Sequence, residues 1–397
     1  MIKKLIEKPI EKITMATPIF TREQIKQYAQ TRLFGSNIGP EDVEKIVLVN
    51  GAMPSMLEKM VKDKHDQYVV VDQDNAREPI LHADGTNYIP QWSGIARERR
   101  YKDLLEAYSK INEEEGRKNF EVEINDFNNG WDIPIVYTNY AYDFVTSMFA
   151  SKEKHKAKRV FLNSDIKEID TVIFGPTKAV LKSKQTTLLY KGQSEYIDAN
   201  IVEIDGKKVL NISYVYADQA RSIISKLLRG HYTLAKNKGQ KKNIDIYMFG
   251  RVGALDNNLD RHDTVIPNAM VDERDLNLQF NKIRSVQNIL AIDYRQPIVN
   301  LNTTSVIKQT IEQLEKARVE GCSIVEMEMK RSYNAIDEAL DYEEFINVNF
   351  GFVGHVSDKP LHIGNGGKRD TLAEELDSDL GERRALAKII ESIIKRR

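Results

Sequence analysis

The feature that most constrains the fold of this chain is an alternation of short apolar runs with helical patterns after residue 133. Alternating strands and helices indicate a largely parallel or mixed β-sheet covered by helices on both faces. Strands are expected at Ile133–Thr138, Thr171–Phe174, Val209–Val215, Ile244–Phe249, Thr264–Ala269, Asn288–Asp293, Ser323–Glu326 and Phe350–Val356. Helices are expected at Ala217–Arg229, Ser305–Glu320, Met329–Leu340 and Leu372–Lys395.

The first 130 residues predict a separate α+β domain. Residues 1–44 read mostly as helix, and Thr21 to Gln24 match a capping box. A turn-rich segment, Asn125–Asp132, separates this part from the rest, so domains are predicted at 1–130 and 131–397. Further expected elements are a strand at Lys45–Asn50, a helix reaching Val61, a strand at Tyr68–Asp72 and a helix at Arg97–Glu115.

Charge and composition argue against several classes of function. The chain of 397 residues carries 58 basic and 59 acidic residues, a net charge of −1, which does not build the basic field that nucleic-acid binding needs. No apolar stretch approaches the roughly 18 residues of a membrane span. Cys322 is the one cysteine, so no intrachain disulfide can form. We therefore expect a cytoplasmic protein with neither a nucleic-acid nor a membrane partner.

The segment Glu326-Met327-Glu328 follows an apolar run and precedes a helical pattern. If the strand continued through it, Glu326 and Glu328 would share one face and could receive a pair of sugar hydroxyls, with Met327 as an apolar wall. That geometry fails if the helix has already begun. The alternative interpretation is an acidic first turn of a helix, favoured by the helix dipole alone.

Asp358 lies in Val356-Ser-Asp-Lys-Pro-Leu-His362, between an apolar run and a glycine-rich loop. We expect the strand to end before it and to leave it partly desolvated at the sheet edge. Desolvation raises the pKa of a carboxyl group, which would let Asp358 act as a general acid near neutral pH. The alternative is a structural Asp that caps a turn through Lys359 and Pro360.

The order of five segments resembles the nucleoside phosphorylase superfamily, and within it the AMP nucleosidase family. These segments are Ile135–Tyr140 with Asp143–Val145, Leu210–Ser213, Gly250–Leu255, Glu326–Glu328 and Val356–His362. The resemblance covers about residues 130–397, and the last segment is similar almost residue for residue. It implies a phosphorylase-like mixed sheet between helices, preceded by an N-terminal regulatory or oligomerisation domain.

The resemblance also implies a chemistry. Asp358 would protonate the purine at N7, Glu328 would bind and stabilise the ribose, and water would attack C1′ of AMP to give adenine and ribose 5-phosphate. Met327, Glu326, Asn139 and Tyr140 would line the ribose and base. The resemblance also implies that no metal or cofactor is needed and that the protein forms homo-oligomers; a hexamer is one candidate form, and the sequence leaves the subunit number open.

The chain departs from the family pattern where phosphate would bind. No arginine follows the Thr138-Asn-Tyr turn, and Tyr214–Arg221 replaces a glycine-bearing loop. Glycines let backbone N–H groups approach an anion, so their loss weakens the case for a phosphorolytic pocket. We interpret the basic side chains of Arg251, Arg221, Lys368 and Arg369 as the candidate replacements.

Two other functions stay open at this point. One is a non-catalytic nucleotide-binding or assembly protein that kept the fold, although such a protein has no reason to keep Asp358 together with Glu328. The other is a nucleosidase or phosphorylase that acts on a purine nucleoside. Dependence on the 5′-phosphate would separate it from an enzyme acting on AMP.

Overall fold

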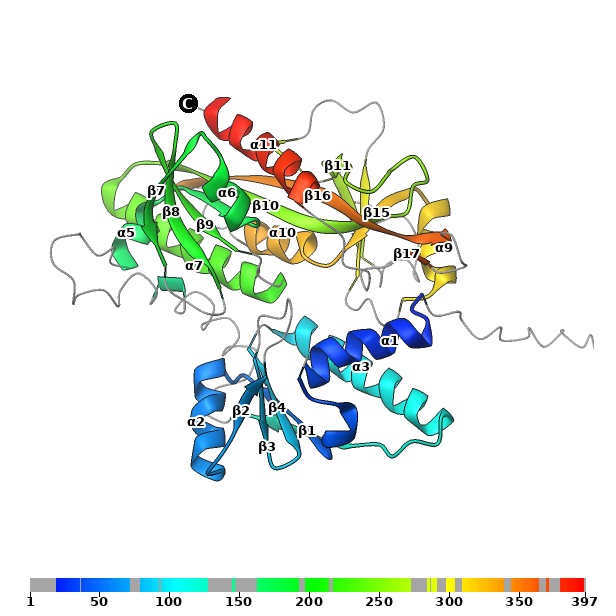
Figure 1. Ribbon diagram of the computed structural model, residues 1–397. Helices are drawn as coiled ribbons and strands as arrows, with labels where there is room; N and C mark the ends of the chain where they lie inside the picture. Colours follow the sequence, from blue (N-terminus) through cyan, green and yellow to red (C-terminus); the bar gives the residue numbers. More distant parts are fainter. Residues whose placement is uncertain are drawn as a thin grey trace, which may run out of the picture.

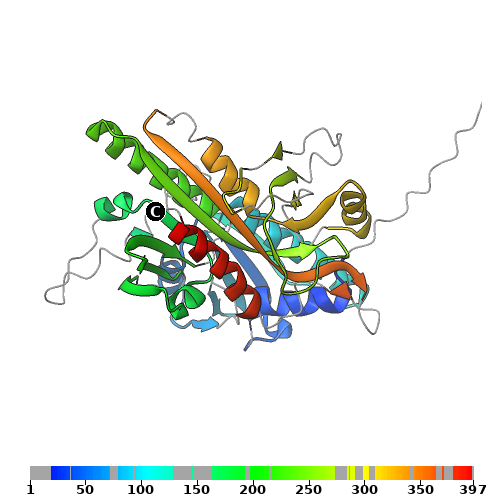
Figure 2. The same ribbon diagram turned by 90° about the horizontal axis from the view of Figure 1, so that it is seen from above.

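A computed structural model gives the fold (Figures 1 and 2). It describes residues 19–35, 37–71, 79–92, 94–127, 145–146, 163–192, 197–213, 217–272, 284–285, 287–290, 298–303, 309–338, 344–363, 369–370 and 379–395. Within these ranges the chain forms two β-sheets, one from residues 45–126 and one from residues 171–370.

The first sheet has five strands in the order β2-β3-β4-β1-β5. Its parallel centre is β1 between β4 and β5, and β2 and β3 continue from β4 as antiparallel strands. The strands are β1 (Lys45–Asn50), β2 (Val69–Val71), β3 (Ile80–Ala83), β4 (Thr86–Gln91) and β5 (Glu121–Asp126). The helices of this part are α1 (Arg22–Ala29), η1 (Gln30–Phe34), η2 (Pro40–Asp42), α2 (Pro54–Lys64) and α3 (Ile95–Glu114).

The second sheet has twelve strands and is mixed, as the sequence predicts. Its main path is β13-β12-β14-β15-β10-β6-β9-β8-β7, and β16 pairs with β10, β11 and β17. The strands are β6 (Thr171–Phe174), β7 (Thr186–Lys191), β8 (Ala199–Ile204), β9 (Lys207–Ile212), β10 (Lys242–Ala254), β11 (Thr264–Val265), β12 (Ala269–Asp272), β13 (Arg284–Ser285), β14 (Val299–Asn302), β15 (Cys322–Glu326), β16 (Ile346–Ile363) and β17 (Arg369–Asp370).

Helices cover both faces of this sheet (Figure 1). On one face, α7 (Ala217–Lys238) and α10 (Met329–Asp337) share an apolar cluster with even-numbered residues of β10 such as Met248 and Val252. On the other, α6 (Thr177–Lys182) and α11 (Asp379–Lys395) pack with Tyr247 and Phe249. The described helices are completed by α5 (Asn163–Glu168) and α9 (Ile311–Val319). The alternation of β10 side chains between the two clusters is what a strand buried on both faces requires.

The two sheets are joined by a shared apolar cluster. It contains buried residues of α1 and α3 together with Leu301 of β14, Leu314 of α9 and Val325 of β15. Figure 1 shows the same arrangement, with α1 and α3 beneath α9 and β15. The cluster therefore buries apolar side chains of the N-terminal part against those of the larger sheet, which favours their association. The boundary near residue 130 stays a prediction.

Most expected elements are confirmed, with shifted ends. The capping box at Thr21 is present: its side chain accepts from the Gln24 backbone N–H, and the Gln24 side chain accepts from the Thr21 N–H. β1, β6, β15, α2, α3, α7 and α10 lie where the sequence predicts them. Residues 1–18, Ile133–Thr138, and the first parts of the helices expected from Ser305 and Leu372 lie outside the described residues.

Three expectations are wrong. The single strand expected at Thr264–Ala269 is two strands, β11 and β12, because Pro267 interrupts the ladder between them. In place of a strand from Asn288, the described residues show one isolated bridge to Phe350, followed by a turn. The strand expected to end at Val356 continues to Ile363, so Asp358 lies inside β16 and not beyond it.

Gly381 tests how tightly α11 packs on the sheet. A Cβ at this position would come within 3.0 Å of the ring of His355, closer than real Cβ atoms approach other atoms. Alanine is favoured over glycine by about 1 kcal/mol in an exposed helix. We nevertheless expect Gly381→Ala to destabilise the protein by about 1–3 kcal/mol, because overpacking outweighs helix propensity.

Urea unfolding of the full chain would measure this effect. Ala387→Gly, at an exposed position of the same helix, is the control that reports helix propensity alone. A Gly381→Ala protein more stable than the parent would show that α11 does not press against His355.

Candidate active site

Asp358 is placed by a β-bulge in the pairing of β10 with β16. The two strands run parallel and in register from Lys242 opposite Ile346 to Val252 opposite Val356. The next pair is Gly253 opposite Asp358, so Ser357 is the extra residue. A bulge bends the strand and redirects the side chain that follows it, and bulges often occur beside active sites.

The carboxyl group of Asp358 is buried, with 5% of the residue exposed. Burial raises its pKa to about 6, although two neighbours favour the charged form. Ser357 Oγ donates a hydrogen bond to Asp358 Oδ1 at 2.7 Å, and the positive charge of Arg261 acts on the same group. Asp358 therefore holds a proton at a pH far above the usual range of an aspartate.

The loop after β10 fixes the backbone around Asp358. The backbone N–H of His262 donates to Val356 O at 3.0 Å, and Val356 N donates to Asp263 O at 3.0 Å. Lys359 Nζ donates to Asp260 Oδ1 at 3.0 Å. Hydrogen bonds on both sides of the bulge thus fix its backbone in one geometry, and a catalytic group needs such a fixed position.

Gly253 brings Asp358 next to β15. A Cβ on Gly253 would lie 3.4 Å from Asp358 Oδ2 and 3.0 Å from Cγ1 of Val325, its partner on β15. Paired residues of neighbouring strands point to the same face, so Asp358 and Val325 share one face of the sheet. Pro360 Cδ lies 3.2 Å from the same position, so any side chain at position 253 would crowd Asp358, Val325 and Pro360.

Strand β15 ends at Glu326, so the alternation does not extend to Glu328. Glu328 is half-buried and is the N-cap residue of α10. Of the two geometries that the sequence allowed, the one in which the helix begins directly after the strand is present. Met327 packs against the same apolar cluster as Val325, whereas Glu326, next to Val325 in the strand, points to the opposite face.

The carboxylate of Glu326 is engaged within the chain. It accepts hydrogen bonds from the side chain of Asn300 and from the backbone N–H groups of Glu328 and Met329, the latter at 2.8 Å. It thereby caps α10 from the preceding strand. Burial, and then the charge of Glu328, raise the pKa of Glu326 above its ordinary value in spite of these donors. A contact between Glu326 and the ribose stays a prediction. In such a contact the sugar hydroxyls would bind carboxylate oxygens that already accept hydrogen bonds from Asn300, Glu328 and Met329.

The basic residues expected to bind phosphate are not all brought together. Arg221 on α7 forms an ion pair with Glu338, whereas Arg251 on β10 pairs with Glu382 of α11 at 3.4 Å. These helices cover opposite faces of the sheet (Figure 1). Asn139, Tyr140 and Lys368 lie outside the described residues, and of Arg369 the structure gives the backbone pairing with Ile363.

Sequence reasoning missed three residues of this region. Ser357 and Gly253 act directly on Asp358, and Arg261 acts through its charge. Gly253 carried a signal, since a glycine inside a strand marks a bulge or a close approach. Arg261 carried none, because its loop lies nearly 100 positions earlier in the chain. Within the described residues, no group of three or more His, Cys, Asp or Glu side chains is placed to hold a metal ion, and no helix is long and apolar enough to cross a membrane.

Solved structures similar to this chain include a purine nucleoside phosphorylase from Toxoplasma gondii in complex with immucillin-H. It is 14% identical, with a TM-score of 0.39 over 58% of this chain and 92% of that chain. A 5′-methylthioadenosine/S-adenosylhomocysteine nucleosidase from Neisseria meningitidis is 12% identical, with a TM-score of 0.36 over 57% of this chain and 98% of that chain. A uridine phosphorylase from Vibrio fischeri is 11% identical, with a TM-score of 0.40 over 64% of this chain and all of that chain. No family model and no curated protein sequence matches the chain.

The buried carboxyl of Asp358 predicts a specific dependence of stability on pH. Its native pKa of about 6 lies above its ordinary value of 3.8, so between these values the folded protein binds more protons than the unfolded chain. The contribution of this group to the free energy of unfolding is largest below pH 3.8, decreases as the pH rises to about 6, and is constant above that pH. Asp358→Asn removes this dependence. We therefore expect the stability of the variant relative to the parent to rise by up to roughly 3 kcal/mol between pH 4 and pH 6.5.

Urea unfolding at a series of pH values would measure the difference, with Asp260→Asn as control. Asp260 lies on the neighbouring loop with a side chain that is 82% exposed, so its removal should not reproduce the rise. A difference between Asp358→Asn and the parent that does not change with pH would show that Asp358 is not buried in solution.

Proposed function

We propose that this protein is a purine nucleotide N-glycosidase that hydrolyses AMP to adenine and ribose 5-phosphate. The observation that carries the proposal is the buried carboxyl group of Asp358, which holds its proton to an unusually high pH. The β-bulge places this group next to Gly253 and beside β15, the strand that is followed by Met327 and Glu328. The resemblance of both segments to the AMP nucleosidase family supplies the substrate.

In the proposed reaction Asp358 gives its proton to N7 of the purine. The C1′–N9 bond then breaks, its electron pair goes to the base, and adenine departs as a neutral leaving group. The sugar becomes an oxocarbenium-like cation. Water attacks C1′ and loses a proton, which restores the acid form of Asp358. Atoms and charges balance without any further reactant.

Glu328 is assigned to the ribose. Glu328 is the N-cap residue of α10, between the end of β15 and the first residue of the helix. Its carboxylate would accept hydrogen bonds from the sugar hydroxyls. The same negative charge would stabilise the cationic sugar in the transition state. Met327, whose apolar cluster lies on the Asp358 side of β15, would form the wall beside them. Glu326 then acts as the positioning residue that holds this turn.

Adenine release from AMP, followed by chromatography, tests the proposal directly. We expect Asp358→Asn to lower kcat/KM by about 10²–10⁴-fold, the usual contribution of a general acid. Asp63→Asn, the same chemical change at an exposed position of α2, should retain activity. Full activity of Asp358→Asn would exclude Asp358 as the acid. No release by the parent protein would favour a non-catalytic binding protein, and equal turnover of adenosine would favour a nucleosidase.

The pH profile provides an independent test. Because the protonated form of Asp358 is the active one, kcat/KM should fall tenfold per pH unit as pH rises above about 6. The 5′-phosphate of AMP also titrates near pH 6, so the profile alone does not identify the group. Ser357→Ala removes the hydrogen bond that favours the carboxylate. We therefore expect this variant to move the inflection to higher pH, whereas an inflection caused by the substrate would not move.

A further inference from the structure

The loop between β10 and β11 contains a residue in an unusual backbone conformation. His262 has a φ of 71°, in the left-handed region that residues other than glycine rarely adopt. It lies just before β11, which pairs antiparallel with β16. Two hydrogen bonds continue this pairing beyond β11, since Val356 N donates to Asp263 O and His262 N donates to Val356 O, both at 3.0 Å. The left-handed turn at His262 therefore coincides with the last of these bonds before Ser357, the extra residue of the bulge.

The bulge decides which side chain faces Gly253. Side chains alternate between the two faces of a regular strand, so Ser357, two residues after His355, would share its face and stand opposite Gly253. The extra residue in the strand gives this place to Asp358. The acid proposed above therefore depends on the bulged pairing, and contacts that hold the loop beside Val356 stabilise that pairing.

The side chain of His262 is held by a second imidazole. The rings of His262 and His355 stack with their centres 5.6 Å apart and their planes 16° from parallel. His355 Nε2 lies 3.4 Å from His262 Nδ1, a long hydrogen bond. The ring of Phe249 also stacks on His355, with centres 6.4 Å apart and planes 24° from parallel. Stacked rings at these distances attract one another, and the hydrogen bond adds a preferred orientation.

His355 is a fixed anchor for this contact. The residue is 1% exposed, and a Cβ at Gly381 of α11 would come within 3.0 Å of its ring, so the ring is closely packed against the helix. Burial, and then the positive charges of His262 and Arg251, lower the pKa of His355 to about 4, so the ring is neutral at neutral pH. Within the described residues its Nδ1 has no hydrogen-bond partner, which places the ring proton on Nε2, from where it is donated to His262.

We propose that His262 and His355 act together as positioning residues for the general acid, because their pairing holds the loop in the left-handed turn that closes the backbone around the bulge. The role rests on the proposed function, since Asp358 is the group that is positioned. A residue in the left-handed region costs free energy and persists where the surrounding contacts over-determine it. The stacked and hydrogen-bonded imidazoles supply those contacts. Without them, the regular pairing that puts Ser357 opposite Gly253 competes with the bulge.

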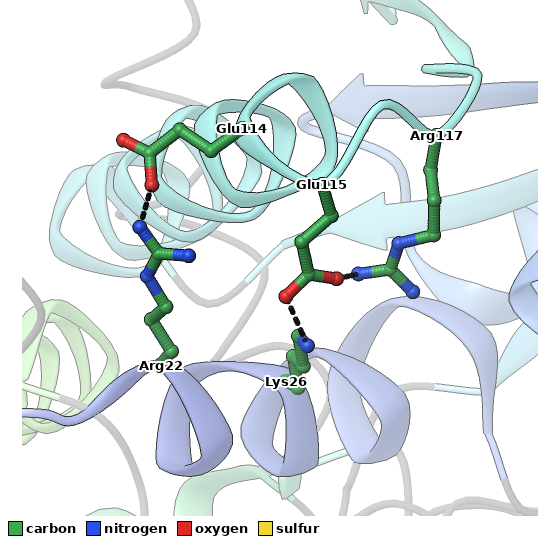
Figure 3. Close-up of polar contacts among 5 residues, drawn as sticks. All are labelled: Arg22, Lys26, Glu114, Glu115 and Arg117. Carbon is green, nitrogen blue, oxygen red and sulfur yellow. Dashed lines mark hydrogen bonds and ion pairs between the residues drawn. The ribbon is translucent and has the colours of Figure 1, made fainter.

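The contacts between α1 and α3 provide a contrast from which a control can be chosen (Figure 3). There Arg22 pairs with Glu114, and Glu115 binds both Lys26 at 2.5 Å and Arg117 at 2.6 Å. These side chains are 29–52% exposed, and ion pairs between exposed side chains contribute little to stability. Glu115→Gln, which weakens two of these contacts, should therefore leave the distant bulge unchanged.

Hydrolysis of AMP by the full chain tests the role of the pair in catalysis. Asparagine adopts the left-handed region more readily than most residues, so His262→Asn keeps the turn accessible and removes the ring. We expect kcat to fall about 10–100-fold with KM within about twofold, because a displaced acid loses its alignment while substrate binding is retained. Glu115→Gln should keep both constants close to those of the parent. A kcat of His262→Asn equal to that of the parent would overturn the proposal.

The titration of Asp358 tests the same role without turnover. Solvation of a displaced carboxyl group lowers its native pKa from about 6 toward the ordinary 3.8, so the folded protein binds fewer extra protons between these pH values. We therefore expect the pH-dependent stability gain of Asp358→Asn to shrink to less than about half when this change is made in His262→Asn. An unchanged gain in urea unfolding would show that His262 does not hold the bulge. Because this comparison needs no activity, it decides the role of the pair even where the parent protein releases no adenine, a result that would contradict the proposed function alone.

A second variant separates ring stacking from the hydrogen bond, and it replaces His262→Asn if circular dichroism shows that this variant does not fold. His355→Phe retains an aromatic ring beside Phe249 and His262 and removes the Nε2 donor. We expect it to lower kcat less than His262→Asn does, and to shift the Asp358 titration in the same direction. A His355→Phe protein with the parent's kcat and the parent's Asp358 titration would overturn the assignment of His355.

Discussion

The pairing of β10 with β16 is the interaction on which the rest of the structure depends. The two strands remain in parallel register from Lys242 and Ile346 to the bulge at Ser357, and they are covered on both faces. Every other described strand of the larger sheet is attached to this pair directly or through a series of neighbouring strands. A parallel pair buried on both faces cannot slip by one residue without exchanging its two apolar faces. The position of Asp358 is therefore fixed by the core and not by the loop that follows it.

The burial of Asp358 in this arrangement lowers the stability of the folded protein at neutral pH. A carboxyl group that holds its proton until about pH 6 must ionise at neutral pH inside the sheet, which lowers stability. Ser357 and Arg261 limit the cost without removing it, since both favour the charged form. A fold selected for stability alone would place an apolar residue opposite Gly253. Retention of a destabilising acid at a bulge is the pattern expected where catalysis needs a proton donor.

The sequence predicted the mixed sheet and most elements because β-branched runs and helical spacing are local signals. It failed where the structure is decided by distant neighbours. Lys359 and Pro360 look like a turn after a strand, yet β16 continues through them because β10 ends at Ala254 and Pro360 loses no hydrogen bond to it. A tight turn at Asp84 and Gly85, both with positive φ, joins β3 and β4. The Asp-Gly pair is a sequence signal for such a hairpin, and the sequence analysis missed it.

The same limit applies to the candidate site. Ser357 could be recognised beside Asp358, but neither the burial of Asp358 nor its position over Gly253 is visible without the register of three strands. The capping of α10 by Glu326 is likewise a tertiary feature, because it needs Asn300 from β14 and two backbone groups of the next turn. Sequence spacing indicates which residues have the right chemistry. The sheet decides which face each of them occupies.

The N-terminal part is connected to the candidate site through packing. Its apolar cluster includes buried residues of α1 and α3, and both Met327 and Leu361 pack against it. Met327 precedes Glu328, and Leu361 follows Asp358 by three residues, so one cluster supports both segments of the proposed site.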